Sequence, residues 1–141
     1  MRQIQQLMKF KTYAKDLSWN DFDNAVLKIA NKFRGKVDGV YGVKRGGLCL
    51  AVALSHELEI PLVTFPNNLD NKILWVDDII ETGKTLKEYL PYNMEYACWV
   101  NVGNHNIYSV ITSKKDEWII FPWENKKRAI SDMEAYVNSR K

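Results

Sequence analysis

The sequence predicts an α/β fold in which helices flank a mainly parallel central sheet. Segments with strand-like apolar patterns alternate with segments whose apolar residues recur at helical spacing, an order typical of βαβ units. Two charged pairs, Lys44-Arg45 and Asp77-Asp78, follow apolar strands, and ligands of parallel sheets bind beyond the carboxyl ends of the strands. A chain of 141 residues, 46% of them hydrophobic, can bury one sizeable core, so we expect a single domain over residues 1–141.

The first half of the chain shows this alternation through two helices and two strands. Ser18 and Asp21 form a capping-box pattern, and apolar residues then recur at helical spacing up to Phe33, which predicts a helix that ends there. The small residues of 47–58 predict a helix that can pack closely on a sheet. The strands predicted in this half comprise residues 37–43 and 61–65.

The second half opens with the most informative run of the sequence. An apolar strand at 73–76 is expected to stop at two adjacent carboxylates, Asp77 and Asp78, and a turn then leads into a helix over about residues 84–90. The remaining predicted elements are strands at 96–102, 107–112 and 118–121 and a final helix with Ile130, Met133 and Val137 on one face.

The turn Thr82-Gly83-Lys84-Thr85 has the composition of a phosphate-binding loop. Backbone amides at a helix start are unpaired donors, and they lie at the positive end of the helix dipole. Gly83 allows a close approach of the anion, the threonine hydroxyls add donors, and Lys84 adds a positive charge. Asp77 and Asp78 would repel a phosphate, so they suit sugar hydroxyls or a hard cation such as Mg²⁺. Together these residues indicate a site for a sugar phosphate and a metal.

Two other interpretations of this run are a nucleotide P-loop and a simple strand end. In a nucleotide P-loop a glycine stands five positions before Gly83, but this sequence has Asp78 there. Asp77 and Asp78 could also be simple turn and N-cap residues at a strand end. The second interpretation is weakened because the strand, the acid pair, Thr-Gly and the helix start occur together in a workable order.

A second anion-binding segment, Lys44-Arg45-Gly46-Gly47, follows the strand at 37–43. Two cations beside two glycines can hold a pyrophosphate through side-chain charge and through backbone amides. An isolated segment of this kind would be interpreted as a solvated basic turn. Its position after a strand of an alternating fold favours the binding role.

Three segments carry a resemblance to the type I phosphoribosyltransferases. Residues 77–85 resemble that family's motif for phosphoribosyl pyrophosphate (PRPP): two acids, two apolar residues, an acid, Thr-Gly, any residue and Thr. Residues 40–48 resemble its pyrophosphate loop. Residues 117–124 resemble the base-binding and C-terminal segment of the small xanthine-guanine enzymes. Order and spacing also agree, so the resemblance covers about residues 13–125.

The resemblance implies a Mg²⁺-dependent transferase of purine salvage. Such an enzyme moves the phosphoribosyl group of PRPP to guanine, xanthine or hypoxanthine, and it releases pyrophosphate and a nucleoside 5'-monophosphate. It also implies a small C-terminal hood segment beside the central sheet, and a cis peptide bond between Lys44 and Arg45.

The resemblance also implies roles for individual residues. Trp118 would stack on the base while the backbone of Ile119 binds its edge, although an aromatic residue on an apolar strand is often simply part of the core. The other implied roles are these: Asp77 and Asp78 hold the ribose hydroxyls and the metal, Glu81 accepts a proton from the base, Thr82, Gly83, Lys84 and Thr85 bind the 5'-phosphate, and Lys44, Arg45, Gly46 and Gly47 bind pyrophosphate.

The sequence departs from the family pattern in three places. Glu81 replaces the usual aspartate and is one methylene longer. The family carries a long mobile loop that closes over the reaction, and at this place the present sequence has only residues 66–72. Residues 103–106 contain no lysine to contact a 6-oxo group, so Asn104 or His105 would have to supply a donor, unless this is only a polar loop.

These departures leave an alternative function open, a PRPP- or nucleotide-binding regulatory protein with weak or absent turnover. A phosphotransfer receiver domain with an acidic pocket is a third interpretation, but it gives Lys44-Arg45-Gly46-Gly47 no task.

Composition sets further expectations. A formal net charge of +3, from 20 basic and 17 acidic residues, does not indicate a nucleic-acid partner. No segment has the length of a membrane span, and residues 1–10 lack the apolar core of a signal peptide. We therefore expect a cytoplasmic protein. The resemblance implies that its partners are the small molecules PRPP and a nucleobase, and we expect a homo-oligomer. Cys49 and Cys98 lie in apolar runs and should be reduced thiols.

Overall fold

The computed structural model describes residues 13–65 and 72–139. Contacts between residues divide the chain into two compact units. One unit is formed by both ends of the chain, residues 1–22 and 114–141, and the other by the continuous stretch 23–113. Each unit contains its own sheet. The single-domain organisation stays a prediction.

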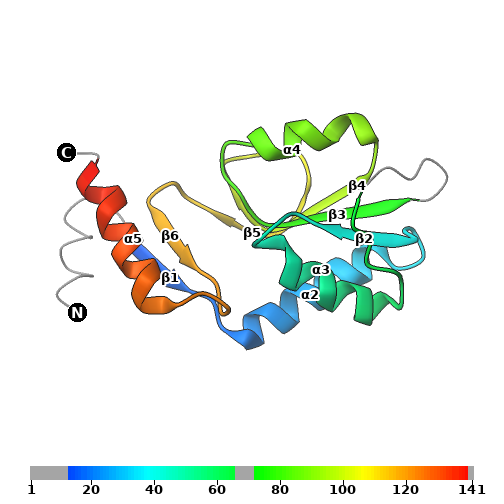
Figure 1. The fold of residues 1–141 in the computed structure, drawn as a ribbon, viewed down its shortest axis with the longest axis horizontal. Helices are drawn as coiled ribbons and strands as arrows, with labels where there is room; N and C mark the ends of the chain where they lie inside the picture. Colours follow the sequence, from blue (N-terminus) through cyan, green and yellow to red (C-terminus); the bar gives the residue numbers. More distant parts are fainter. Residues whose placement is uncertain (1–12, 66–71, 140–141) are drawn as a thin grey trace. The chain divides into compact units, whose positions relative to one another are not determined.

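The unit of residues 23–113 is built on a parallel four-stranded sheet (Figure 1). Its strands are β2 (Gly39–Gly42), β3 (Ile73–Ile80), β4 (Glu95–Val102) and β5 (Tyr108–Ser113), in that spatial order. All three neighbouring pairs are parallel, which confirms the predicted sheet. The loops that follow β2 and β3 therefore emerge at the same edge.

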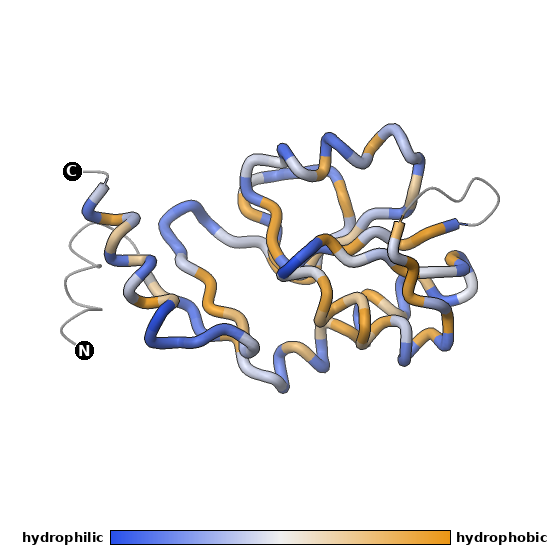
Figure 2. The backbone as a smooth tube through the Cα atoms, viewed as in Figure 1, coloured by the Kyte–Doolittle hydropathy of each residue, from blue (hydrophilic) through white to orange (hydrophobic). Residues whose placement is uncertain are grey.

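Helices cover both faces of this sheet. Figure 1 shows α4 (Lys84–Tyr89) on one side and α3 (Gly47–Leu58) on the other, the same side as α2 (Trp19–Phe33). A short 3-10 helix, η1 (Leu90–Tyr92), continues α4. Beneath α4 lies a core cluster of Val43, Trp75, Ile80, Leu86 and Cys98. Figure 2 shows the most hydrophobic backbone along the strands and α3, as expected for a sheet buried on both faces.

Close packing of α3 follows from its small residues. A Cβ atom at Gly42 would lie 2.6 Å from the Cβ of Ala51 and 2.7 Å from the carbonyl oxygen of Gly47. The helix buries Gly47, Leu50, Ala51 and Leu54 against the sheet. Its predicted bounds, 47–58, are confirmed.

Two predicted strands differ from the structure. β3 does not stop at Val76 but continues through the acid pair to Ile80, because Asp77 and Ile79 stay in register with Cys98 and Val100 of β4. The strand predicted at 61–65 is wrong: only an isolated bridge joins Leu62 to Val40. Proline at 61 has no amide hydrogen to extend a ladder there.

The other unit contains a small sheet that the sequence patterns did not predict in full. β1 (Tyr13–Asp16), which was not predicted, pairs in parallel with β6 (Glu117–Ile120). The final helix, α5 (Lys126–Ser139), buries Met133 and Val137, and Ile130 packs beside them, which confirms the predicted apolar face.

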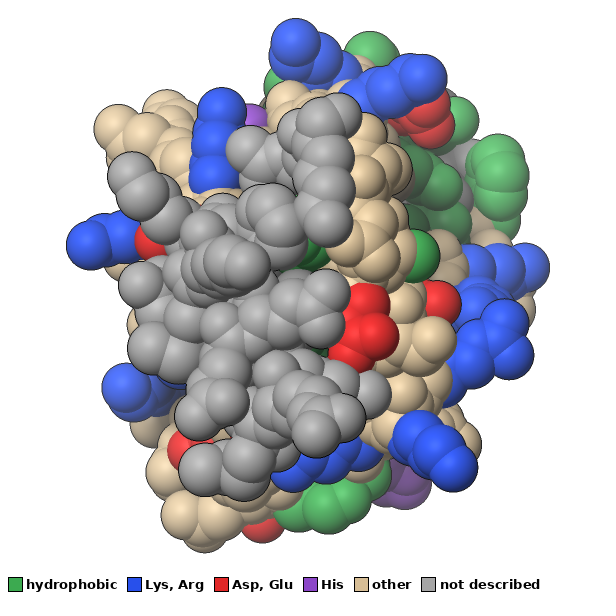
Figure 3. Space-filling model, turned by 90° about the vertical axis from the view of Figure 1, so that its left-hand side faces the viewer, with side chains coloured by type: hydrophobic (Ala, Val, Ile, Leu, Met, Phe, Trp, Pro, Cys, Tyr) green, Lys and Arg blue, Asp and Glu red, His purple; other side chains and the backbone are tan. Residues whose placement is uncertain are grey.

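Charged side chains of both signs lie on the surface of the protein. On the face drawn in Figure 3, Lys and Arg side chains lie at several separate places, with Asp and Glu side chains between some of them. Within residues 13–65 and 72–139, no helix combines the length and the apolar character needed to cross a bilayer.

The predicted capping box at the start of α2 is present. The Ser18 amide donates to Asp21 Oδ2 at 2.8 Å, and the Asp21 amide donates to Ser18 Oγ at 3.0 Å. The hydrogen bonds from the Ser18 amide and hydroxyl hold the pKa of the Asp21 carboxyl below its usual value. Two amides that the helix itself leaves unpaired thus find acceptors.

Replacing Ser18→Ala should remove half of this capping box. We expect a loss of about 1 kcal/mol in the free energy of unfolding, measured by urea denaturation at neutral pH, because one amide at the helix start loses its acceptor. Ser139→Ala, at the exposed end of α5, is the control and should change stability by less than about 0.5 kcal/mol. Equal losses in the two variants would contradict the capping role.

Candidate functional site

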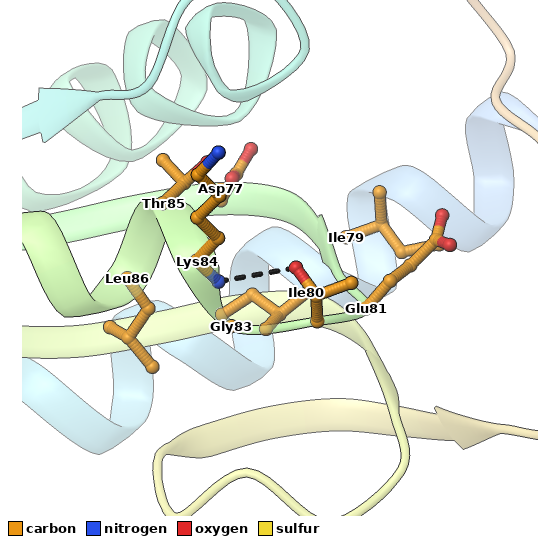
Figure 4. Close-up of a pocket in the computed structure, with 9 residues that line it drawn as sticks. Asp77, Ile79, Ile80, Glu81, Gly83, Lys84, Thr85 and Leu86 are labelled. Atoms are coloured by element: carbon orange, nitrogen blue, oxygen red, sulfur yellow. Dashed lines mark hydrogen bonds between the residues drawn. The ribbon is translucent and has the colours of Figure 1, made fainter.

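A pocket of about 310 Å³ opens at the carboxyl end of β3 (Figure 4). Its lining comes from a single strand–turn–helix segment: Asp77 and the run from Ile79 to Leu86. Asp77, Glu81 and the four residues predicted to bind the 5'-phosphate therefore line one cavity, between the end of β3 and the start of α4. Asp78 and the predicted pyrophosphate loop are not among its lining residues.

The two carboxyl groups of the acid pair are half-buried and bound to backbone amides. The Asp78 amide donates to Asp77 Oδ1 at 2.8 Å, and the Ile79 amide donates to Asp78 Oδ1 at 2.7 Å. Burial, reinforced by the neighbouring Asp78 carboxyl, raises the pKa of Asp77 to about 8. Burial also raises the pKa of Asp78. Such a pair favours a shared proton or a bound cation over two free charges.

The acid pair fits the ligand preference of Mg²⁺. This ion takes oxygen ligands and is held in many sites by one or two carboxylates, with phosphate oxygens and water completing the shell. The described residues contain no cluster of three or more Asp, Glu, His or Cys side chains that could hold a metal alone. Asp77 and Asp78 could thus hold Mg²⁺ only together with a ligand or water.

The turn that follows β3 has the geometry of an anion-binding loop. Gly83 precedes α4 in the left-handed conformation, with φ of +79°, and is buried. The Lys84 amide donates to Thr82 Oγ1 at 3.2 Å, the hydrogen bond drawn in Figure 4. The side chains of Thr82, Lys84 and Thr85 are exposed and so are accessible to a ligand.

Glu81 presents its side chain and its backbone to different surroundings. The side chain is exposed, and Figure 4 shows it extending away from Lys84 and Thr85. Its carbonyl oxygen lies 2.6 Å from Nε2 of His105, a residue in the turn between β4 and β5. His105 is thus bonded to the turn after β3, a contact that the sequence patterns did not reveal.

The predicted pyrophosphate loop links β2 to α3 and lies against the acid pair. The Lys44–Arg45 peptide bond is cis, as the resemblance implies, and both side chains are exposed. A Cβ atom at Gly46 would overlap the carboxyl group of Asp78, and one at Gly47 would lie 2.7 Å from the carbonyl oxygen of Val76. The predicted pyrophosphate loop therefore contacts the acid pair, at Gly46 and Asp78, and the turn 82–85 follows the same strand as that pair.

The predicted base-binding residues lie on β6, in the unit formed by the two ends of the chain. Ile119 is buried and in register with Lys15 of β1. Trp118 is half-buried, and its ring centroid lies 5.4 Å from that of Tyr136 on α5. This packing is typical of a core aromatic, and the base-binding role of both residues stays a prediction. The predicted short loop also stays a prediction, because residues 66–71 lie outside the described part of the chain.

Both cysteines are free thiols, as predicted. Cys98 is buried opposite Asp77 in the β3–β4 pair. Burial, with the charges of the acid pair, raises the pKa of Cys98 to about 12. This side chain is therefore a neutral core residue at neutral pH.

Comparisons with known proteins find similarity to phosphoribosyltransferases. A scan against models of protein families found no match. A xanthine-guanine phosphoribosyltransferase of Nitratidesulfovibrio vulgaris (strain DP4) is 27% identical over 138 residues, covering 80% of this chain and 78% of that protein.

Solved structures give a stronger match. A purine phosphoribosyltransferase from Pyrococcus horikoshii OT3 is 31% identical, with a TM-score of 0.67 over 79% of this chain and 94% of that one. The xanthine-guanine-hypoxanthine phosphoribosyltransferase of Helicobacter pylori shares the fold at 20% identity, with a TM-score of 0.66 over 85% and 99% of the two chains.

The contact between Gly46 and Asp78 predicts a non-additive pair of substitutions. Gly46 has right-handed helical dihedrals that alanine adopts easily, so Gly46→Ala should cost about 1–3 kcal/mol of stability only through overlap with the Asp78 carboxyl. Adding Asp78→Ala should recover most of this loss in a double-mutant cycle measured by urea denaturation. Additive losses would contradict the contact.

The pKa of Asp77 predicts a pH dependence of stability. At pH values between 3.8, the usual pKa of an aspartate, and about 8, the pKa of Asp77 in the folded protein, Asp77 keeps a proton that it has lost in the unfolded chain. The stability of the ligand-free protein should therefore fall as pH rises through this interval. Asp77→Asn should remove that contribution, so the variant gains stability over the parent as pH rises from about 4 to about 8.

Urea denaturation at a series of pH values, without metal, measures this difference. Asp23→Asn, which replaces an exposed carboxyl group on α2, should keep the pH dependence of the parent. If the free energies of unfolding of Asp77→Asn and the parent differ by the same amount at all pH values, Asp77 does not titrate in this way.

Proposed function

The chain belongs to the type I phosphoribosyltransferase family and is a transferase enzyme, and we propose that it moves the phosphoribosyl group of PRPP to a purine base. The observation that carries this proposal is the contact of the predicted pyrophosphate loop with the acid pair, on the strand that leads into the predicted 5'-phosphate turn. Gly46 of the loop after β2 lies against Asp78, and the turn 82–85 continues from the same strand. One molecule with phosphate groups at both ends of a ribose matches this arrangement.

In the proposed complex, each segment takes one part of PRPP. The turn Thr82-Gly83-Lys84-Thr85 would bind the 5'-phosphate through backbone amides, hydroxyls and the lysine charge. The loop Lys44-Arg45-Gly46-Gly47 would bind the pyrophosphate. The two exposed cations and the backbone amides at the two glycines would contact its phosphate oxygens. Asp77 and Asp78 lie between these segments and would hold the ribose hydroxyls.

Mg²⁺ is proposed as the cofactor. Chelated by PRPP, it would offset the charge that develops on the departing pyrophosphate. Support comes from the donor set: two half-buried carboxyl groups whose pKa values are raised in the absence of a cation. Binding of a cation there would favour their ionised forms and add to the affinity for PRPP.

The proposed reaction exchanges one bond at carbon 1 of the ribose. The bond from carbon 1 to the pyrophosphate oxygen breaks, the bond to a base nitrogen forms, and that nitrogen gives up its proton. Lys44 and Arg45 would stabilise the pyrophosphate as its charge grows. Glu81, whose side chain is exposed, would accept the proton.

A purine is proposed as the acceptor because the relatives compared above are named for purines, among them xanthine, guanine and hypoxanthine. The turn 103–106 contains no lysine for a 6-oxo group, and His105 already bonds to the Glu81 carbonyl through Nε2. Recognition of the 6-oxo group would therefore fall to another donor, for which Asn104 is proposed; its side chain is exposed, as is that of Asn106.

A regulatory PRPP-binding protein with low turnover remains the second candidate. The orientation of Glu81, whose carboxylate extends away from Lys84 and Thr85, favours it. The two functions share the PRPP site and differ only in product formation, so one series of experiments separates them.

The test combines calorimetry with a product assay. We expect the protein to bind PRPP in the presence of Mg²⁺ and to convert guanine, xanthine or hypoxanthine to the 5'-monophosphate, with adenine and uracil as comparison bases. Binding without product from any of the bases would favour the regulatory candidate. Absence of PRPP binding would overturn both.

Loss of the acid pair should abolish most of this activity. Asp77→Asn/Asp78→Asn is expected to lower kcat/KM for PRPP at least about 100-fold, because two charge-assisted contacts disappear. Asp23→Asn/Asp38→Asn, which neutralises two exposed carboxyl groups of the same unit, is the matched control and should retain parental activity. A double variant of the acid pair that behaves like the parent would remove Asp77 and Asp78 from the site.

A further inference from the structure

His105 contacts the phosphate-binding turn from a different loop of the same unit. Its Nε2 lies 2.6 Å from the carbonyl oxygen of Glu81, the residue that precedes the turn. A carbonyl oxygen can only accept, so Nε2 carries the hydrogen and donates it. The imidazole is thus held in one tautomer or in its protonated form.

The same ring covers the glycine of the turn. A Cβ atom built on Gly83 would lie 2.9 Å from Cε1 and 3.0 Å from Nδ1 of His105. Gly83 is buried although both of its neighbours, Thr82 and Lys84, are exposed. His105 therefore contacts the backbone of the turn on both sides of Thr82.

His105 is itself fixed by a buried asparagine. Asn101 is only 3% exposed. Its Nδ2 donates to the His105 carbonyl oxygen at 2.9 Å, and its Oδ1 accepts from the His105 amide at 3.3 Å. Both polar ends of this buried side chain are thus used on the backbone of one residue, which offsets the cost of burying them.

Asn101 in turn belongs to the central sheet. It is in register with Ile80 of β3 on one side and with Thr112 of β5 on the other. Strand pairing thus links Ile80, the last residue of β3, to Asn101, and hydrogen bonds link Asn101 to His105 and His105 to Glu81. Glu81 directly follows Ile80 in the chain, so these contacts form a closed ring. This ring of contacts joins the turn to the rigid sheet at a second point.

We propose that His105, held by Asn101, is a positioning residue that keeps the turn 82–85 in the conformation that binds the 5'-phosphate. The proposal rests on the proposed function, since it assigns that turn to PRPP. A loop that is ordered before binding loses less conformational entropy when the ligand arrives. The effect should therefore appear in the affinity for PRPP and not in the affinity for the base.

The first test separates the affinities of the two substrates. His105→Leu removes the donor at similar volume, and we expect PRPP to bind about fivefold more weakly by calorimetry with Mg²⁺, the loss typical of one hydrogen bond. KM for PRPP should rise in proportion, with KM for the base unchanged. His105→Gln offers an N–H at similar reach and should restore most of the affinity.

The second histidine of the chain provides the matched control. His56 is exposed on α3, and the sequence contains no histidine besides these two. His56→Leu and His56→Gln should bind PRPP like the parent. Thermal unfolding of each variant shows whether any loss of affinity reflects loss of the fold.

A spectroscopic measurement tests the contact without changing it. Imidazole nitrogen-15 spectra of the parent, assigned with His56→Gln, should show His105 with a proton on Nε2, and its resonances should shift when PRPP and Mg²⁺ are added. A neutral His105 with its proton on Nδ1 would overturn the proposal even if His105→Leu failed to fold.

The binding results show separately whether the proposed function and the role of His105 hold. If the parent fails to bind PRPP, the proposed function and this role of His105 both fall. If the parent binds PRPP and folded His105→Leu binds it equally well, only the role of His105 is overturned. Equal losses in folded His105→Leu and His105→Gln would also overturn it, because the amide donor would not have replaced the imidazole.

Discussion

The site depends on two adjacent carboxyl groups that are half-buried at the end of a central strand. Removing carboxylates from water is costly unless amides, a proton or a cation compensate. Here the amides of Asp78 and Ile79 supply part of the compensation, and the raised pKa of Asp77 shows that it is incomplete. The desolvation cost of the two carboxyl groups is therefore only partly offset in the ligand-free protein. A cation or ribose hydroxyls bound to them would offset more of it.

The surrounding elements are arranged around this pair. Because β2 and β3 are parallel neighbours, the loops after them leave the sheet at one edge. Close packing of α3, which requires Gly42 and Ala51, brings Gly46 against Asp78. The turn after β3 is reached from a third strand, β4, through Asn101 and His105. Three of the four parallel strands thus position the residues that are proposed to bind PRPP.

Patterns within short segments allowed much of the fold to be predicted. The capping box of α2, the bounds of α3 and the apolar face of α5 all depend on residues a few positions apart, and all are confirmed. The end of β3 was placed too early because charged side chains usually mark a strand end, whereas pairing with β4 continues beneath them. The error at 61–65 arose because apolar residues alone do not ensure a pairing partner.

The candidate site was predictable only in part. Asp77 and residues 79–85 belong to one continuous segment, so their shared pocket follows from the local strand–turn–helix order. The contact of His105 with Glu81 joins residues that are 24 positions apart, and it uses a backbone carbonyl, a group that every residue possesses. No side-chain pattern marks such a contact. The roles of Trp118 and Ile119 could not be predicted from the pattern for a different reason. An apolar strand with an aromatic residue has the same pattern whether it binds a base or packs in a core.

The pairing of β1 with β6 has a consequence for the order in which the protein is assembled. This pairing joins residues 13–16 to residues 117–120, so the small sheet can form only after synthesis has passed the second strand. The unit of residues 23–113, which carries both segments that are proposed to bind PRPP, is continuous and leaves the ribosome earlier. During translation these two segments can thus be present while the strand that carries Trp118 and Ile119, the residues predicted to bind the base, is still being made.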